Sequence, residues 1–246
     1  MTTLLLSSRH TSDNQALWRA AIHRGWSVQR AQGIRLPALH DNNVVLYIES
    51  LYAPTIANQL GLRLLDIPEN WLPSVPADLL KRNVSLSTLG EVKAFCHNTF
   101  VKPPNEKSFQ AKVYPNANAL PTEFDDSTTV LISDPVEWEL EFRCFCLNQQ
   151  VVTLSPYFRA GELAAKTNFV CTDQERSAAQ SLAETVLHAT RDITPNAVVI
   201  DVGRISGKGW AVVEANAAWG SGIYGCNPGL VLDVIQAATI PDKEES

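Results

Sequence analysis

One stretch of the chain, residues 198–227, restricts the possible folds more than any other part of the sequence. A β-branched run ends on Asp201, turn residues follow at 206–209, and an apolar run then ends in Glu-Ala-Asn at 214–216. This pattern predicts two antiparallel strands joined by a tight turn. Residues two apart on a strand face the same side, so Glu214 and Asn216 lie together and the partner strand brings Asp201 beside them. Three oxygen-bearing side chains on one face suit Mg²⁺; the alternative is a hairpin with charged ends.

Residues 138–152 form a second strand-like stretch with polar residues on alternate positions. Glu139, Glu141 and Arg143 face one side of it, and apolar residues face the other. A buried charge without a partner is costly, so these side chains are expected to meet cations or phosphates. The alternative is a solvent-facing strand with a ladder of Glu and Arg side chains. Asn148-Gln149-Gln150 is predicted to be the hairpin turn that ends the first strand.

Two further cations lie at the ends of predicted strands. Lys102 ends the apolar run 99–102, and Pro103-Pro104 stops that strand. A lysine beside a polar loop is typical of a phosphate contact; a solvated lysine at a strand end is the alternative. Residues 155–161 are predicted to be a loop that carries Arg159.

The N-terminal third alternates strand-like and helix-like segments, which predicts a small α/β domain. Three prolines between residues 67 and 76 indicate a linker, so we expect one domain over residues 1–76 and a second over residues 77–246. No G-x-G-x-x-G follows the first strand, so the dinucleotide fingerprint is absent. The expected strands are 3–6, 26–30, 44–48 and 62–65, and the expected helices end at Gly25 and Gly61.

Composition excludes several classes of function. The 246 residues carry a net charge of −6, and an acidic chain binds nucleic acid and anionic membranes poorly. No apolar run approaches the ~20 residues that span a bilayer, and the first residues lack the basic segment of a signal peptide. The five cysteines include no C-x-x-C pair, which favours reduced thiols in a cytoplasmic protein without a zinc site. We therefore expect no nucleic-acid and no membrane partner.

Strand-borne signals recur in one order along the chain, and in this order the chain resembles the ATP-grasp superfamily. More narrowly, it resembles the clade of short ATP-grasp domains named for two arginines and one lysine. The segments that carry the resemblance, FVKPPNEKSF, SDPVEWELEFRCF and IDVG…VVEANAAWGSGIYG, lie within residues 80–240. The signals are Lys102, then Glu141 with Arg143, then Asp201, then Glu214 with Asn216.

The resemblance implies a fold of the α+β / α/β class. Residues 77–246 would form the ATP-grasp domain, whose two α+β lobes grip ATP, and residues 1–76 the preceding small α/β domain. It implies that Asp201, Glu214 and Asn216 bind Mg²⁺. Both ATP and Mg²⁺ are therefore expected cofactors.

The resemblance also implies the residues that contact the nucleotide. Lys102 would hold the α- and β-phosphates. The backbone of a hinge made of Ile132, Ser133, Asp134 and Val136 would meet adenine. Many ATP-grasp enzymes place a glycine-rich loop over the phosphates, but this chain has PPNEKSFQAK there. Side chains in place of backbone would then contact the phosphates, from Lys107, Ser108 and Lys112.

Roles for the remaining candidates follow from the same resemblance. Arg143 would meet the γ-phosphate or an acyl-phosphate, and Glu141 would orient Arg143 or a second cation. Arg159 would contact the acceptor or the transferred phosphate, and Arg82 is a further candidate nucleotide contact.

The implied activity is that of an ATP-dependent, ADP-forming carboxylate–amine ligase that acts through an acyl-phosphate. Its substrates would be small-molecule, peptide or protein carboxylates and amines. Two alternatives remain open at this point: a catalytically reduced ATP-binding module that serves as a sensor or partner protein, and a structural α/β domain with charged hairpins.

Overall fold

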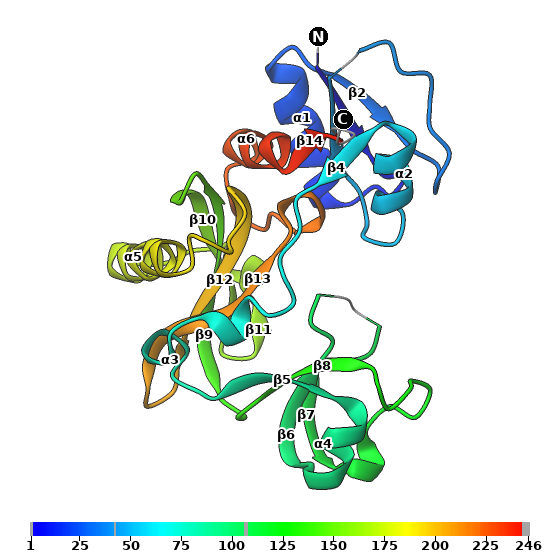
Figure 1. The fold of residues 1–246 in the computed structure, drawn as a ribbon. Helices are drawn as coiled ribbons and strands as arrows, with labels where there is room; N and C mark the ends of the chain where they lie inside the picture. Colours follow the sequence, from blue (N-terminus) through cyan, green and yellow to red (C-terminus); the bar gives the residue numbers. More distant parts are fainter. Residues whose placement is uncertain (1, 42, 106–107, 243–246) are drawn as a thin grey trace.

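The computed structural model describes residues 2–41, 43–105 and 108–242. Three units that each contain a β-sheet follow one another along the length of the molecule (Figure 1). A three-stranded sheet lies at one end, a five-stranded sheet lies in the middle, and a four-stranded sheet lies at the other end. The middle sheet carries most of the predicted site residues, so the outer units matter here for what they bring to it.

The N-terminal unit is a parallel sheet in which β1 lies between β2 and β3. Its central strand is a run of three leucines, all fully buried, because a parallel strand is covered on both faces. The linker that leaves this unit packs Trp71 into the protein interior. The elements are β1 (Thr2–Leu6), α1 (Ser12–His23), β2 (Ser27–Arg30), β3 (Asn43–Tyr47), α2 (Ala53–Gln59), β4 (Leu62–Leu64), η1 (Leu72–Ser74) and α3 (Ala77–Leu80).

The four-stranded unit is an antiparallel sheet in the order β5-β8-β6-β7, packed on helix α4. Thr88 caps that helix in a capping box with Glu91, which fixes where the helix begins. The buried face of α4, Leu89 and Val92, meets Val130 of the central strand. The elements are β5 (Val84–Thr88), α4 (Leu89–Phe95), β6 (His97–Lys102), β7 (Lys112–Asn116), η2 (Ala117–Ala119) and β8 (Thr129–Ser133).

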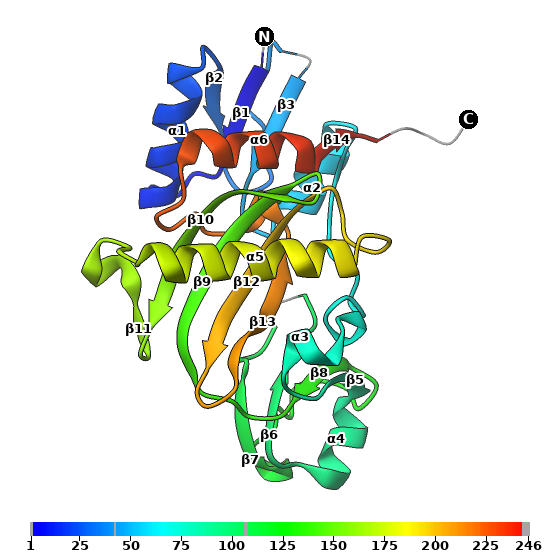
Figure 2. The ribbon, with the colours of Figure 1, turned by 90° about the vertical axis from the view of Figure 1, so that its left-hand side faces the viewer.

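The five-stranded middle sheet has the order β11-β10-β9-β12-β13, and helix α5 lies across one of its faces (Figure 2). Asn148 and Gln149 join β9 to β10 with positive φ angles of 50° and 65°, which suits the tight turn of a hairpin. The elements are β9 (Trp138–Leu147), β10 (Gln150–Arg159), β11 (Glu162–Leu163), η3 (Ala164–Thr167), α5 (Asp173–Ala189), β12 (Ala197–Ile205) and β13 (Gly209–Asn216).

The two faces of the middle sheet differ in polarity because side chains alternate along each strand. Phe142 and Ile200 belong to the apolar core on the α5 side. On the opposite face lie Glu141, Arg143 and Asp201, which are buried polar residues. The alternation read from residues 138–146 is therefore that of a strand buried on both sides, and not that of a solvent-facing ladder.

The C-terminal segment returns to the N-terminal unit. Helix α6 (Pro228–Ala238), which follows η4 (Ala218–Gly220), packs its apolar face into the same core as β1 and β3. Strand β14 (Thr239–Pro241) then pairs with β4, a pairing that the sequence did not predict. The division of the chain near residue 76 stays a prediction, and the structure adds that the last helix belongs to the core of the first unit.

One predicted loop is wrong. Residues 155–159 continue strand β10 instead of forming a loop, so Arg159 projects from a strand end. Pro156 and Gly161 gave the turn signal, but Pro156 sits at a register shift of the strand, where its missing N–H is tolerated. In the part of the chain that the structure describes, no helix has the length and apolar character needed to cross a membrane.

Helix α5 generates a test of the fold. Its N-cap Thr172 accepts a hydrogen bond from the Glu175 backbone N–H, and the Glu175 carboxylate accepts one from the Thr172 backbone N–H. Thr172→Ala removes one of these two bonds, so we expect it to lower the free energy of unfolding by about 1 kcal/mol. Thr172→Ser keeps the hydroxyl and is the matched control. Denaturant titrations measure both; equal losses in the two variants would contradict the assigned cap.

Candidate functional site

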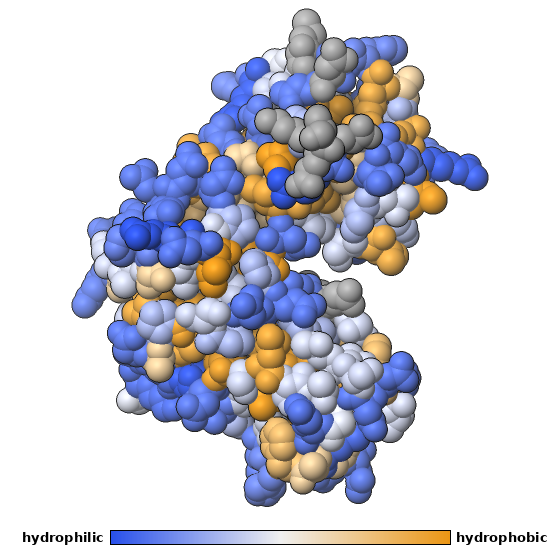
Figure 3. All heavy atoms as spheres, viewed as in Figure 1, coloured by the Kyte–Doolittle hydropathy of each residue, from blue (hydrophilic) through white to orange (hydrophobic). Residues whose placement is uncertain are grey.

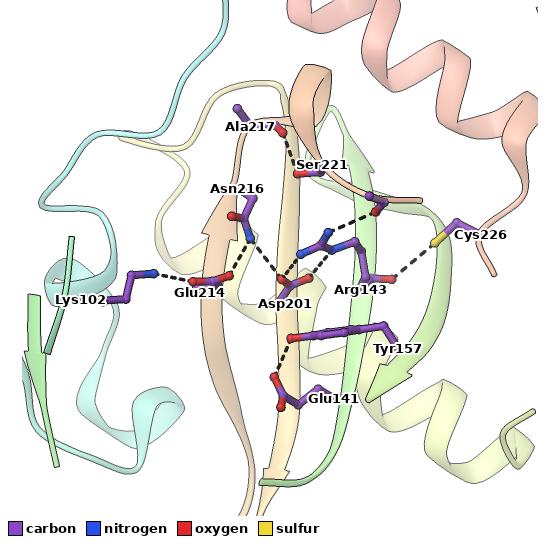
Figure 4. Close-up of polar contacts among 11 residues, drawn as sticks. Lys102, Glu141, Arg143, Tyr157, Asp201, Glu214, Asn216, Ala217, Ser221 and Cys226 are labelled. Atoms are coloured by element: carbon purple, nitrogen blue, oxygen red, sulfur yellow. Dashed lines mark hydrogen bonds and ion pairs between the residues drawn. The ribbon is translucent and has the colours of Figure 1, made fainter. Parts of the chain in front are cut away.

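Two neighbouring strands bring three oxygen-bearing side chains together on the polar face of the middle sheet. Asp201 on β12 lies directly opposite Glu214 on β13 in the strand register. Asn216, two residues further along β13, donates from Nδ2 to Asp201 Oδ2 and to Glu214 Oε1, both at 3.1 Å. Figure 4 shows the three side chains in a row across the two strands. The juxtaposition expected from the sequence is therefore present.

Each carboxylate of this cluster is held by a cation from a different strand. Arg143 on β9 lies opposite Asp201 and binds both its oxygens, with Nε–Oδ1 at 3.0 Å and Nη2–Oδ2 at 2.6 Å. Lys102, at the end of β6 in the four-stranded unit, binds Glu214 Oε2 (Figure 4). The second contact joins two sheets, so it ties the outer unit to the middle one.

The electrostatics of the cluster follow from burial and from these pairs. Burial raises the pKa of the Glu214 carboxyl, but the charge and hydrogen bond of Lys102 outweigh it and, with the Asn216 amide, lower that pKa to about 2. Burial lowers the pKa of Arg143, but the Asp201 carboxylate outweighs it and raises that pKa above its ordinary value. Glu214 and Arg143 are therefore both charged across the ordinary pH range.

Two tyrosines enclose Arg143. Its guanidinium carbon lies 5.3 Å from the ring centroid of Tyr157 and 5.1 Å from that of Tyr224, distances typical of cation–π contacts. Its Nη1 donates to the Gly222 carbonyl at 3.1 Å. Arg143 is thus fixed between a strand and the loop that follows β13, with 8% of its surface exposed.

Glu141 has a different partner from the one expected. The sequence gave it the role of orienting Arg143, whereas the structure places Asp201 there and has Glu141 accept a hydrogen bond from the Tyr157 hydroxyl. Burial of the Glu141 carboxyl raises its pKa to about 7, although the Tyr157 bond opposes that rise. The sequence missed the Asp201–Arg143 pair because the pairing of β9 with β12 is not visible in either strand alone.

Two adjoining cavities open onto the cluster. One of about 950 Å³ is lined by Arg143, Tyr157 and Asn216, among others. It occupies the cleft between the N-terminal and four-stranded units, which Figure 3 shows as a deep notch. The other, of about 320 Å³, lies between the four-stranded unit and the middle sheet. Lys102 and Glu214 line both cavities and mark the place where they meet.

The smaller cavity gathers the candidates for nucleotide contact. Lys102 and Lys112 line one part of it, and Phe100, Leu131 and Trp138 supply apolar surface that the sequence analysis did not single out. The only signal for these three was their position on apolar strands. The hinge residues line it as well, so it contains Arg82, Ile132, Ser133, Asp134 and Val136.

Other candidates lie elsewhere. Both terminal guanidinium nitrogens of Arg159 bind Glu175 at 3.0 Å, and this pair lowers the pKa of Glu175 to about 2. Arg159 lines neither of the two cavities. Ser108 lines the larger cavity, and Lys107 lies outside the described residues.

The donor set fits a divalent cation of the oxygen-binding kind. Glu214 and Asn216 line the larger cavity, and the two N–H bonds of Asn216 leave its amide oxygen available. Asp201 is fully buried behind them and engaged by Arg143. Within the described ranges, no group of three His, Cys, Asp or Glu side chains is placed to hold a metal, because the third donor here is an amide.

Comparison with known proteins gives a family and a fold. A family model described as an ATP-grasp domain, the second family of the clade named for two arginines and one lysine, matches residues 79–234. The solved structure of D-cycloserine synthetase DcsG is similar at a TM-score of 0.58 and 12% identity, covering 96% of this chain and 99% of that one. D-alanine–D-alanine ligase from Bacillus anthracis is similar at 0.53 and 10%, with 97% of each chain covered. The ATP-grasp ligase PsnB, complexed with a minimal precursor, is similar at 0.52 and 12%, covering 96% and 98%. No curated protein sequence matches the chain.

Burial of Glu141 generates a pH-dependent prediction. Its folded-state pKa is raised from 4.5 to about 7, so its favourable contribution is complete below pH 4.5 and is lost as pH rises through about 7. Glu141→Gln cannot ionise and still accepts the Tyr157 hydrogen bond. We expect its stability relative to the parent protein to rise between pH 4.5 and pH 8 by on the order of 3 kcal/mol at most. Denaturant unfolding at the two ends of this range measures the change; a difference independent of pH would contradict the assignment.

Proposed function

Since the chain belongs to the second ATP-grasp family of the clade named for two arginines and one lysine, we propose that it is an ADP-forming ligase that joins a carboxylate to an amine. The ATP-grasp fold expected from the sequence is confirmed by the solved structures that share it. One observation carries the proposal. The cavity that holds the predicted adenine contacts meets a larger cavity at Lys102 and Glu214, beside Asn216 and Arg143.

The nucleotide would bind with its base in the smaller cavity and its phosphates at Lys102. The apolar walls of Phe100, Leu131 and Trp138 suit a flat aromatic base, and the backbone near Ser133 offers polar groups to its edge. Lys112 lines the same cavity and is proposed as a second cation for the phosphates. This placement directs the γ-phosphate into the larger cavity, where a carboxylate substrate has room.

The chemistry needs charge neutralisation and exclusion of water. A carboxylate is a poor acyl donor, and transfer of the γ-phosphoryl group would give an acyl-phosphate that an amine attacks with loss of phosphate. Lys102 and Arg143 are placed to stabilise the negative charge that develops in such a transfer. Mg²⁺, held by Asp201, Glu214 and Asn216, would add charge neutralisation at the phosphates.

Space for a second substrate lies next to the larger cavity. A further cavity of about 560 Å³ shares Gly220, Gly222 and Tyr224 with it. Arg9 and Glu49, from the N-terminal unit, also line this space. The proposed substrates are small-molecule, peptide or protein carboxylates and amines, and a cytoplasmic location without nucleic-acid or membrane partners stays a prediction.

A second function has one observation in its favour. The loop after Lys102, PPNEKSFQAK, lacks the glycines that would let backbone N–H groups wrap a triphosphate. A chain that binds ATP and does not turn it over would serve as a nucleotide-responsive module.

Binding of ATP is the first test. Lys102→Ala removes the cation at the junction of the cavities, so we expect ATP in the presence of Mg²⁺ to bind with a dissociation constant raised about tenfold to hundredfold. Lys166→Ala, at an exposed lysine that pairs with Glu162, is the control and keeps the parent affinity. Isothermal titration calorimetry measures both. An unchanged affinity in Lys102→Ala would argue against the phosphate role.

Turnover separates the two functions. We expect ADP release from Mg·ATP to require a carboxylate and an amine from a mixed panel, and Glu214→Gln to abolish it while the protein stays folded. Coupled detection of ADP and circular dichroism give the two readouts. Tight ATP binding with no ADP release across the panel would favour the nucleotide-responsive module; ADP release by Glu214→Gln at the parent rate would refute the metal assignment.

A further inference from the structure

The strand that carries Glu214 and Asn216 contains a β-bulge at the site. Strand β13 is the edge strand of the middle sheet. Asp201 pairs with Glu214, and the next residue of β12, Val202, pairs with Val212, so Val213 is an extra residue without an opposite partner. A bulge of this kind changes which way the following side chains point and is enriched next to active sites.

The bulge decides which side of the sheet Glu214 faces. In a regular strand Val212 and Glu214 would share a face, because they are two residues apart. With the extra residue, Val212 is fully buried in the apolar core on the α5 side, while Glu214 lines both cavities on the opposite side. The metal-binding face of β13 therefore exists only while the bulge is kept.

Arg82 holds this bulge from outside the sheet. Its Nη1 donates to the Val212 carbonyl at 2.6 Å, and its Nη2 donates to the Val213 carbonyl at 2.9 Å. Nη1 also donates to the Leu80 carbonyl at 3.1 Å. The guanidinium thus occupies the edge of β13, where carbonyl groups have no neighbouring strand to bind. In the described part of the chain Arg82 forms no ion pair, and its bonds go to backbone carbonyls.

A stacked frame keeps the guanidinium in place. Its carbon lies 5.1 Å from the ring centroid of Trp138. Trp138 in turn lies over Gly203 of β12, where an added Cβ would come within 2.7 Å of the indole ring and of the Leu140 carbonyl. The close approach of the ring therefore requires glycine at this position. Arg82, Trp138 and Gly203 form one continuous support beneath the bulge.

We propose that Arg82 is a positioning residue that locks the Val213 bulge and thereby sets Glu214 and Asn216 for the metal of a metal–nucleotide complex. The inference rests on the proposed function for the identity of that ligand. It differs from the sequence expectation, in which Arg82 contacts the nucleotide directly. The planar fork of arginine matches two successive carbonyls, whereas the single ammonium of lysine binds one of them.

The test compares Arg82→Gln and Arg82→Lys with Lys81→Gln. Lys81 is the matched control because it also binds a backbone carbonyl of the β12–β13 hairpin, that of Lys208, away from the bulge. For each protein, calorimetry gives the affinity for ATP with Mg²⁺ and with a chelator, and the affinity for adenosine. The ratio of the two ATP affinities is the metal coupling.

We expect Arg82→Gln to reduce the metal coupling about tenfold to hundredfold, the usual cost of removing a group that supports metal ligands. Adenosine affinity should stay near that of the parent, Arg82→Lys should not restore the coupling, and Lys81→Gln should keep it. Three results would overturn the proposal: an unchanged coupling, a loss of adenosine affinity that matches the loss for Mg·ATP, or full rescue by Arg82→Lys, which would assign the effect to charge alone.

Hydrogen exchange tests the same lock without any nucleotide. Backbone amides of residues 211–216 should exchange faster in Arg82→Gln and Arg82→Lys than in the parent and in Lys81→Gln. Unchanged exchange in both arginine variants would overturn the proposal. If the parent protein binds no ATP, the proposed function fails, and the exchange data still decide whether Arg82 holds the bulge. If Arg82→Gln does not fold, the lysine variant carries both measurements.

Discussion

The site depends on one buried ion pair, Arg143 with Asp201. Asp201 is fully buried, and a carboxylate there would be strongly destabilising without a partner. The bidentate guanidinium supplies that partner from the adjacent strand. The same arginine also binds the carbonyl of Gly222 and stacks between two tyrosine rings, so it ties the sheet to the loop after β13. One side chain therefore fixes both the centre of the polar cluster and one wall of the larger cavity.

Irregular strands shape the polar face as much as regular ones do. Pro156 pairs with Phe142 and Phe158 pairs with Glu141, which leaves Tyr157 as an extra residue in β10. A second extra residue lies in β13, before Glu214. These two bulges bring Tyr157 and Glu214 onto the polar face from opposite sides of the β9–β12 pair, and the strands between them supply the buried cation and carboxylate. The sheet thus combines a continuous apolar face with a polar one.

Local pattern was sufficient for the hairpin that carries Asp201, Glu214 and Asn216, because a turn signal and a period of two fix the register. It was also sufficient for the helices that begin at Thr88 and Thr172, which both have capping boxes. It failed where partners are distant in sequence. Arg143 and Asp201 are 58 residues apart, and the pairing of β4 with β14 joins the first third of the chain to its last residues. Such pairings depend on the order of strands in a sheet, which neither strand encodes by itself.

The return of α6 to the first sheet has a consequence for the birth of the protein on the ribosome. Val231, Leu232 and Ile235 of this helix share a core with the leucines of β1, although they are among the last apolar residues of that core to be synthesised. The first unit to emerge is consequently the last to close its interior. During translation its leucine-rich strand stays without its final cover, which makes this interval the moment at which a nascent chain of this kind depends most on chaperones.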